Sequence, residues 1–158
     1  MQPIIDETRK YMWQRIQTLY MAISTILIAV MFFSNEAVCY GAEGEVLDSI
    51  GFTQKVTHLI LLIVILILNF LALTVVSHRV FQMRTAVLAA IVTLALQIWI
   101  AVDFFAIREV YVFKLPAIFP AVCIILDILA ARGILADQLL VESSSSLRKS
   151  RRERRSKR

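Results

Sequence analysis

The sequence predicts an all-α fold, an integral membrane four-helix bundle followed by a disordered basic C-terminal tail. Composition is the first observation behind this prediction: 59% of the 158 residues are hydrophobic and the mean hydropathy is +0.74, whereas soluble domains are about 45–50% apolar. The second observation is distribution, because the apolar residues are concentrated in blocks and most of the charge lies outside them. This pattern is typical of membrane spans and not of a soluble core.

Four apolar blocks are long enough to cross a bilayer as helices. Each has about 18–23 residues, and a rise of about 1.5 Å per residue makes that length sufficient for a hydrocarbon core of about 30 Å. None of the blocks alternates polar and apolar residues, as strands of a membrane barrel would. The predicted organisation is a cytoplasmic N-terminal segment, residues 1–15, and a membrane domain, residues 16–131, with spans at 16–33, 59–76, 85–107 and 110–131.

The distribution of Lys and Arg predicts the orientation. All 17 of these residues except Lys55, Arg108 and Lys114 precede the first span, lie between the second and third spans, or follow the fourth. The positive-inside rule therefore places both termini in the cytoplasm. The first block is longer than a signal-peptide core of about 7–15 residues, and no small-x-small cleavage site follows it, so we expect it to stay as a span.

Two features of the last two spans predict how they pack. Small residues at spacings of three and four form a close-packing face on the third span: Ala86, Ala89, Ala90 and Thr93. In the fourth span, Pro116 and Pro120 each remove a helical donor, which predicts a kink or a late start to the regular helix.

The first span opens with a motif, Gln-Arg-Ile-Gln-Thr-x-Tyr, within the stretch WQRIQTLYMAISTILIAVMFF. Its defining residues are Gln14, Arg15, Gln17, Thr18 and Tyr20. Together with the exit ILAARGILADQLLVESSSSLRKS, this stretch resembles an uncharacterised domain-of-unknown-function family of small bacterial four-span inner-membrane proteins. The resemblance implies a multi-pass protein of the bacterial inner (cytoplasmic) membrane with cytoplasmic ends, and it implies no activity, because none is established for the family. The final RRERRSKR is an extension beyond the resemblance.

Charged residues inside the predicted spans are the candidate functional residues, because a charge in the membrane costs about 2.5–3.5 kcal/mol on insertion scales and is usually paired. Asp103 and Lys114 lie on either side of the turn between the third and fourth spans, at similar depth. This placement predicts an intramembrane ion pair that holds the two helices together. A proton or ion relay and snorkelling of the side chains to water are the alternatives.

A second candidate polar site comprises Asp127, Gln97 and Asn69. Asp127 is placed near the cytoplasmic end of the fourth span, at a depth that Arg79 or Arg84 could approach, which favours a structural pair. The alternative is a substrate or proton site, in which Gln97 or Asn69 and water would connect Asp127 with the opposite face.

Motifs for metals, cofactors and catalysis are scarce. His58 and His78 are 20 residues apart, about 30 Å along a helix, so one chain does not offer two histidines to one haem. Cys39 and Cys123 lie in a loop and in a span, and no Cys-x-x-Cys cluster exists. Glycine-rich phosphate loops, Gly-x-Ser-x-Gly and His-Glu-x-x-His are also absent from the sequence. We therefore expect no metal, no cofactor, no catalytic residue and no enzyme activity.

The connections outside the spans carry weaker signals. The first loop, SNEAVCYGAEGEVLDSIGFTQKVTH, is interpreted as a connector with the capacity for a short amphipathic surface helix. Residues 132–142 are predicted as an amphipathic surface helix and residues 143–158 as a flexible basic tail.

Basic side chains near the end of the tail predict contact with anionic lipid headgroups, at about 1 kcal/mol for each residue near the surface. These residues are Arg148, Lys149, Arg151, Arg152, Arg154, Arg155, Lys157 and Arg158. Nucleic acid is the disfavoured partner, because no aromatic residue interleaves the charges to stack on bases.

These observations predict a non-catalytic scaffold, assembly or accessory subunit of the membrane. Its partners would be membrane lipids and either another protein or further copies of the chain. The alternative function is a small oligomeric transporter or ion-conducting protein that uses Asp103 and Asp127.

Overall fold

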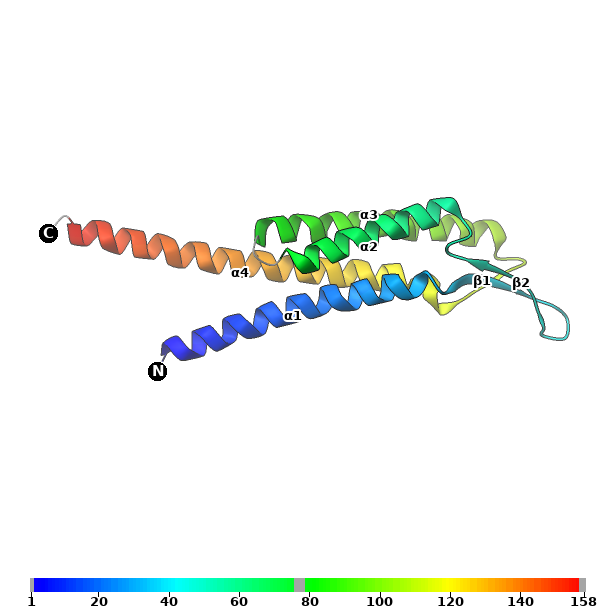
Figure 1. The fold of residues 1–158 in the computed structure, drawn as a ribbon, viewed down its shortest axis with the longest axis horizontal. Coiled ribbons are helices and arrows are strands. Elements are labelled where there is room, and N and C mark those ends of the chain that lie inside the picture. The colour runs from blue at the N-terminus through cyan, green and yellow to red at the C-terminus, as the bar shows by residue number, and fades with distance from the viewer. Residues whose placement is uncertain (1, 76–78, 157–158) are drawn as a thin grey trace.

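Long helices account for most of the chain and run side by side (Figure 1). The computed structural model describes the backbone of residues 2–75 and 79–156, and the side chains of residues 16–75, 80–139 and 143. The helices are α1 (Gln2–Met31), α2 (Val56–Thr74), α3 (Arg79–Ile107) and α4 (Phe119–Ser156), with a short 3₁₀ helix, η1 (Leu115–Ile118), in front of α4.

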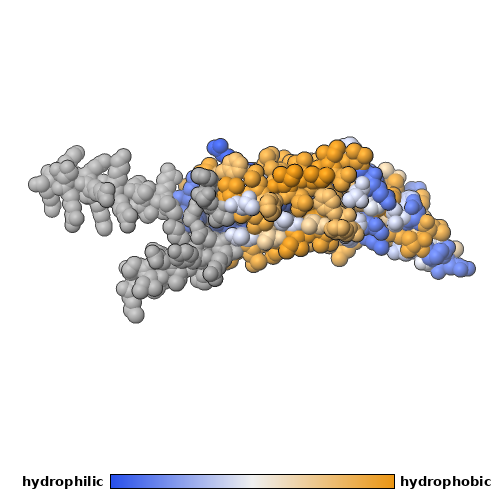
Figure 2. Space-filling view, viewed as in Figure 1, coloured by the Kyte–Doolittle hydropathy of each residue, from blue (hydrophilic) through white to orange (hydrophobic). Residues whose placement is uncertain are grey.

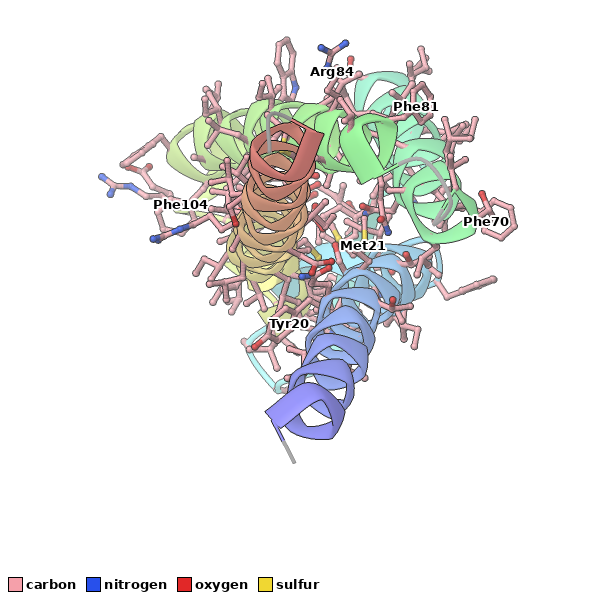
Figure 3. All side chains as sticks on the ribbon, turned by 90° about the vertical axis from the view of Figure 1, so that its left-hand side faces the viewer. Tyr20, Met21, Phe70, Phe81, Arg84 and Phe104 are labelled. Carbon is pink, nitrogen blue, oxygen red and sulfur yellow. The ribbon has the colours of Figure 1, made fainter. Side chains whose placement is uncertain are left out.

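The four helices pack around a common interior, because α1 and α3 each lie against both α2 and α4. Figure 3, which looks along the helices, shows Met21 pointing into this interior, whereas Phe70, Phe81 and Arg84 point away from it. The small residues predicted to form a packing face on α3 are buried: Ala86, Ala89, Ala90 and Thr93. Short side chains allow α3 to approach its neighbours closely.

The interior contains two apolar clusters. One lies toward the β-strands and includes Ile28, Phe52, Leu62 and Leu96. The other includes Met21 of α1 and alanines of the remaining three helices. Large aliphatic side chains therefore fill one part of the bundle, and small side chains bring the helices together in the other.

Three helices are long and apolar enough to cross a membrane: Val56–Thr74, Val80–Ile107 and Leu115–Leu139. Ile16–Met31 of α1 is a shorter apolar segment. Figure 2 shows the consequence on the surface, a hydrophobic belt over the middle of the bundle with hydrophilic patches beyond it at both sides. A belt of this size is typical of a surface that faces lipid and suggests a membrane protein.

The loop after α1 is a β-hairpin, and the interpretation of part of it as an amphipathic helix is wrong. Strands β1 (Asn35–Tyr40) and β2 (Val46–Gly51) pair antiparallel, and β3 (Val112–Phe113) pairs with the other edge of β1. The chain reverses at Gly41 and Gly44, and Gly44 has a φ of +81°, which suits glycine. Two runs with β-branched residues around a glycine-rich turn favour this hairpin over a helix.

Regular helix in the fourth segment begins later than the predicted span 110–131. Residues 112–113 belong to β3, and Pro116 lies in the first turn of η1, so α4 starts at Phe119. The late start agrees with the expectation from the prolines, which lack the backbone N–H that a helix interior uses.

The end of α4 differs from the prediction of a separate surface helix followed by a flexible tail. The backbone stays helical through residues 132–142 and on to Ser156. Arg, Lys, Glu and Leu are good helix formers, and no proline follows Pro120 to stop the helix. The side chains of the eight basic residues predicted to contact lipid, Arg148 to Arg158, lie outside the described residues.

Candidate functional site

Four ionisable side chains meet at the end of the bundle that carries the strands. Glu36 comes from β1, Lys55 immediately precedes α2, His58 lies in the first turn of α2, and Asp103 lies near the end of α3. The hairpin brings Glu36 over the helix ends, because β1 follows α1 after only a short turn and is fixed on its second edge by β3. We call these four residues the ionic cluster.

Distances within the ionic cluster are short. Lys55 Nζ lies 2.7 Å from Asp103 Oδ2 and 3.5 Å from Glu36 Oε2. The imidazole of His58 lies between the two carboxylates, with Nδ1 3.3 Å from Glu36 Oε2 and Nε2 3.3 Å from Asp103 Oδ2. Glu36 and His58 are fully buried, whereas the side chains of Lys55 and Asp103 keep 29% and 21% of their exposure. The cluster is therefore closed on one side and open to solvent on the other.

Hydrogen bonding in the ionic cluster is incomplete. Lys55 donates a hydrogen bond to Asp103, but neither oxygen of Glu36 and neither ring nitrogen of His58 has a hydrogen-bond partner. The 3.3 Å contacts of His58 thus bring polar atoms together without the alignment that a hydrogen bond needs. Buried polar atoms without partners cost folding free energy, because they lose their hydration without gaining a hydrogen bond. A ligand that bound these atoms would remove that cost.

The predicted ion pair between Asp103 and Lys114 is wrong: Asp103 pairs with Lys55. Lys114 follows β3, and its backbone N–H donates to the carbonyl of Glu36, while its side chain is exposed. Pairing of β3 with β1 takes this segment out of the helical geometry on which the prediction rested.

A second cluster lies in the middle of the bundle and contains no basic residue. Asn69 Nδ2 donates to Ser24 Oγ at 3.3 Å, and the thiol of Cys123 contacts the carbonyl of Ser24 at 3.7 Å. Asp127 is fully buried beside Ser24 and Cys123, and neither of its carboxylate oxygens has a partner with hydrogen-bond geometry. Because Ser24 Oγ accepts from Asn69, its own hydrogen is available to Asp127. We call Ser24, Asn69, Cys123 and Asp127 the central cluster.

The structure partly changes the second predicted site. Asn69 and Asp127 both lie beside Ser24, which the sequence did not single out. Gln97 is half-buried, and its Oε1 has no hydrogen-bond partner. Arg84 points away from the bundle (Figure 3), so it does not neutralise Asp127. The side chain of Arg79 lies outside the described residues.

An apolar layer separates the two clusters. On α2, Leu62 and Ile65 are fully buried between His58 and Asn69. Ile28, Leu96 and Ile100 contribute to the same apolar cluster from the neighbouring helices. No hydrogen bond or ion pair among the described residues links the two clusters.

The N-terminal motif takes part in helix packing. Gln17 is buried against Gly133 of α4, where an added Cβ would lie 2.9 Å from Gln17 Cγ. Tyr20 is partly buried against the alanine-rich apolar cluster. Thr18 also makes an interaction, and the side chains of Gln14 and Arg15 lie outside the described residues. The motif thus helps α1 and α4 approach each other.

A shallow groove of about 340 Å³ runs along the outer face of α3 and α4. Its walls include Val87 and Ile91 on α3 and Ile128 and Leu135 on α4, and these side chains are exposed. Arg132 lies among the lining residues and is its one charged member. The groove is a place where an apolar chain or helix can pack.

The sequence did not single out Glu36, Lys55 or His58 as site residues. A signal was present, because all three flank predicted spans at the same end as Asp103. A single histidine has no ligand spacing that would mark it, and the position of Glu36 depends on the fold of the first loop, which the local sequence does not specify. Placing Glu36 over the helix ends requires the hairpin.

Comparison with known proteins gives one positive result. The model of the family DUF4293, described as a domain of unknown function, matches residues 13–147. The matched range contains the strands, α2 and α3 completely and most of α1 and α4, and it ends before the last basic residues. No curated protein and no solved structure matched the chain.

Proposed function

The chain belongs to the DUF4293 family, and we propose that it is a four-span protein of the bacterial inner membrane that acts as a non-catalytic scaffold, assembly or accessory subunit. Three spanning helices and the apolar segment Ile16–Met31 supply the four spans. Both chain ends lie at one end of the bundle and the hairpin lies at the other (Figure 1), as an even number of spans requires.

Charge supports an orientation with both termini in the cytoplasm. The start of α3 and the final part of α4 lie at the end with the termini (Figure 1). Arg84 is in the second turn of α3, and the basic tail forms the end of α4. The hairpin at the opposite end carries Glu43, Glu45 and Asp48. Positive residues are retained on the cytoplasmic side during insertion, so the hairpin is the extracytoplasmic part. The tail then lies beside anionic headgroups, its proposed lipid partners.

The observation that carries the accessory role is the groove between α3 and α4. Its exposed walls are apolar, and its floor contains Ala90 and Ala131, which are small and nearly buried. Small residues let a second membrane helix approach closely, which is the main source of attraction between helices in lipid. We propose that a transmembrane helix of a protein partner or of a second copy packs in this groove.

Transport is the second candidate, and Asp127 is the observation that favours it. A fully buried carboxylate without a basic partner is rare in a membrane helix and often marks an ion or proton pathway. The apolar layer of Leu62 and Ile65 counts against a continuous pathway. The accessory role therefore agrees better with this apolar layer than transport does.

The test is native mass spectrometry of the full chain extracted in a mild detergent. We expect a defined complex with a partner or a second copy, and a reduced share of it when Ile91→Ala and Ile128→Ala are combined. The matched control combines Ile60→Ala and Ile67→Ala, which remove similarly exposed side chains from α2. Equal loss in both double variants, or a monomer throughout, would contradict binding in the groove. A chain that ends at Leu147 separates any contribution of the basic tail.

Proton or ion flux into liposomes containing the purified protein distinguishes transport. Flux that Asp127→Asn abolishes, with the protein still folded, would favour the transporter over the accessory subunit. We expect no flux above protein-free liposomes.

A further inference from the structure

We infer that Glu36, His58 and Asp103 form a binding site for a divalent transition-metal ion, with Zn²⁺ as the best-suited candidate. One ligand atom from each residue lies within 4.8 Å of the other two. Three ligand atoms with mutual distances of at most 4.8 Å all lie within about 2.8 Å of one central point, where an ion would sit. Zn²⁺ binds nitrogen and carboxylate oxygen at about 2.0–2.2 Å. By distance alone, each ligand atom has to move by less than about 1 Å to reach the ion.

The ligand types suit Zn²⁺. Imidazole nitrogen favours zinc and its neighbours in the transition series, and two carboxylates supply the negative charge that a dication needs. Only one nitrogen of His58 binds the ion, so the other keeps a hydrogen and faces a carboxylate. Three protein ligands leave a fourth position, and the partial exposure of Asp103 opens that position to solvent.

The charge balance of the ionic cluster calls for a further cation. Two carboxylates and the single ammonium of Lys55 leave one negative charge in a site where Glu36 is fully buried. A buried charge without compensation is costly. A dication bound to both carboxylates and a neutral imidazole makes the site neutral without Lys55, whose side chain reaches solvent. Lys55 is thus the competitor of the metal and occupies the carboxylates in its absence.

A doubly protonated His58 is the rival way to balance the charge. That imidazolium would donate one hydrogen bond to Glu36 and one to Asp103. The structure disfavours this arrangement, because neither ring nitrogen of His58 meets hydrogen-bond geometry at the 3.3 Å contacts.

The site also has an apolar side. Phe52 is fully buried, and its ring centroid lies 6.4 Å from that of His58. Such a shell excludes water and strengthens coordination.

Metal binding would join separate parts of the fold. Glu36 lies on β1, His58 on α2 and Asp103 on α3, so one ion would fix the hairpin to two helices. A ligand that binds only the folded state stabilises that state by an amount that grows with the logarithm of the ligand concentration divided by its dissociation constant. The site therefore predicts a rise in the unfolding temperature when Zn²⁺ is added.

The test is a titration of the full chain in detergent with Zn²⁺, after chelation and removal of the chelator, followed by calorimetry and by metal analysis. We expect one Zn²⁺ per chain. Glu36→Gln, His58→Gln and Asp103→Asn should each weaken binding at least about tenfold. Lys55→Gln should bind Zn²⁺ more tightly, because it removes the competing ammonium. Size-exclusion profiles establish which variants fold.

Two matched controls sharpen the titration. Asp127→Asn removes a buried carboxylate outside the ionic cluster, and His78→Gln removes the other histidine of the chain. Both should bind Zn²⁺ as the unchanged protein does. The inference is overturned if the unchanged protein binds no Zn²⁺, or if the three ligand variants bind as tightly as the controls. Unchanged affinity in Lys55→Gln would overturn the competition by Lys55. Tetrahedral Co²⁺ absorption bands, lost in His58→Gln, give a readout independent of folding yield.

Discussion

The ionic cluster and the central cluster each contain a carboxylate in the interior, but they balance it differently. Asp103 receives a hydrogen bond from Lys55 at 2.7 Å and keeps part of its side chain exposed. Asp127 is fully buried beside the neutral Ser24 and Cys123, and no ion pair is formed by it among the described residues. A carboxylate near a polar end of the bundle can recruit a lysine and water, whereas one in the middle cannot. Position along the bundle, more than residue type, decides what each aspartate can do.

The largest expected contrast between the two regions is in thiol access, because each region contains one cysteine. Cys39 lies on β1 in the hairpin and is partly exposed, whereas Cys123 is fully buried against Ser24. A membrane-impermeant maleimide added to intact cells after the outer membrane is permeabilised should label Cys39 and leave Cys123 unlabelled. The measurement is gel shift or mass spectrometry, with Cys39→Ser as the control. Labelling only after the inner membrane is broken would reverse the proposed orientation.

Removal of the lysine should be the most destabilising of the charge changes. Lys55→Gln leaves two carboxylates facing each other without their cation, and we expect a loss of about 2 kcal/mol in unfolding free energy, between the values for surface and buried pairs. Denaturant unfolding in mixed micelles, with chelator present, measures this loss. Combining Lys55→Gln with Asp103→Asn should restore part of it, because the two residues interact directly. Strict additivity would show that the pair does not contribute.

The opposite sign is expected in the central cluster. Asp127→Asn removes a buried carboxylate that has no cation, so unfolding free energy should stay the same or rise by up to about 1 kcal/mol. The same unfolding experiment measures it, with Asp103→Asn, which should lose stability, as the comparison. If Asp127→Asn lost as much unfolding free energy as Lys55→Gln, the carboxylate of Asp127 would have a stabilising partner, as Asp103 has.

The smallest effect is expected at the rim of the hairpin. The phenol of Tyr111 donates a hydrogen bond of 2.7 Å to Asp48, and this bond to the carboxylate raises the pKa of Tyr111 above its ordinary value of about 10. A raised pKa means that the contribution to stability is present below the ordinary value and is lost as the pH rises through the folded value. Asp48→Asn should lower the pKa of Tyr111, as followed by tyrosinate absorbance against Tyr111→Phe. An unchanged titration would show that the contact is not kept in solution.

Sequence reasoning succeeded where the signal is local. Helices cover most of the predicted spans, α3 ends at Ile107 as its predicted span does, and the alanine face of α3 is buried. The family resemblance, based on the stretch at the first span, is confirmed by the match over residues 13–147. Each of these depends on composition or on residue spacing within one segment, and both are fixed by the chain itself.

Sequence reasoning failed where partners come from distant segments. Depth alone paired Asp103 with Lys114, but Lys55 occupies that place because the start of α2 lies beside the end of α3. Glu36 could not be assigned to any site until β1 paired with both β2 and β3.

The sequence alone therefore determined that the chain is rich in long apolar helices and that most of its basic residues lie on one side of the predicted spans. It also determined a family membership, without an activity. Hydrophobic composition and helical period are properties of contiguous residues, so they can be read without a fold. Only the tertiary structure decided that Glu36, His58 and Asp103 share one small space and that Asp127 has no basic partner among the described residues. Such contacts depend on strand pairing and helix packing between segments far apart in the chain, which no local pattern specifies.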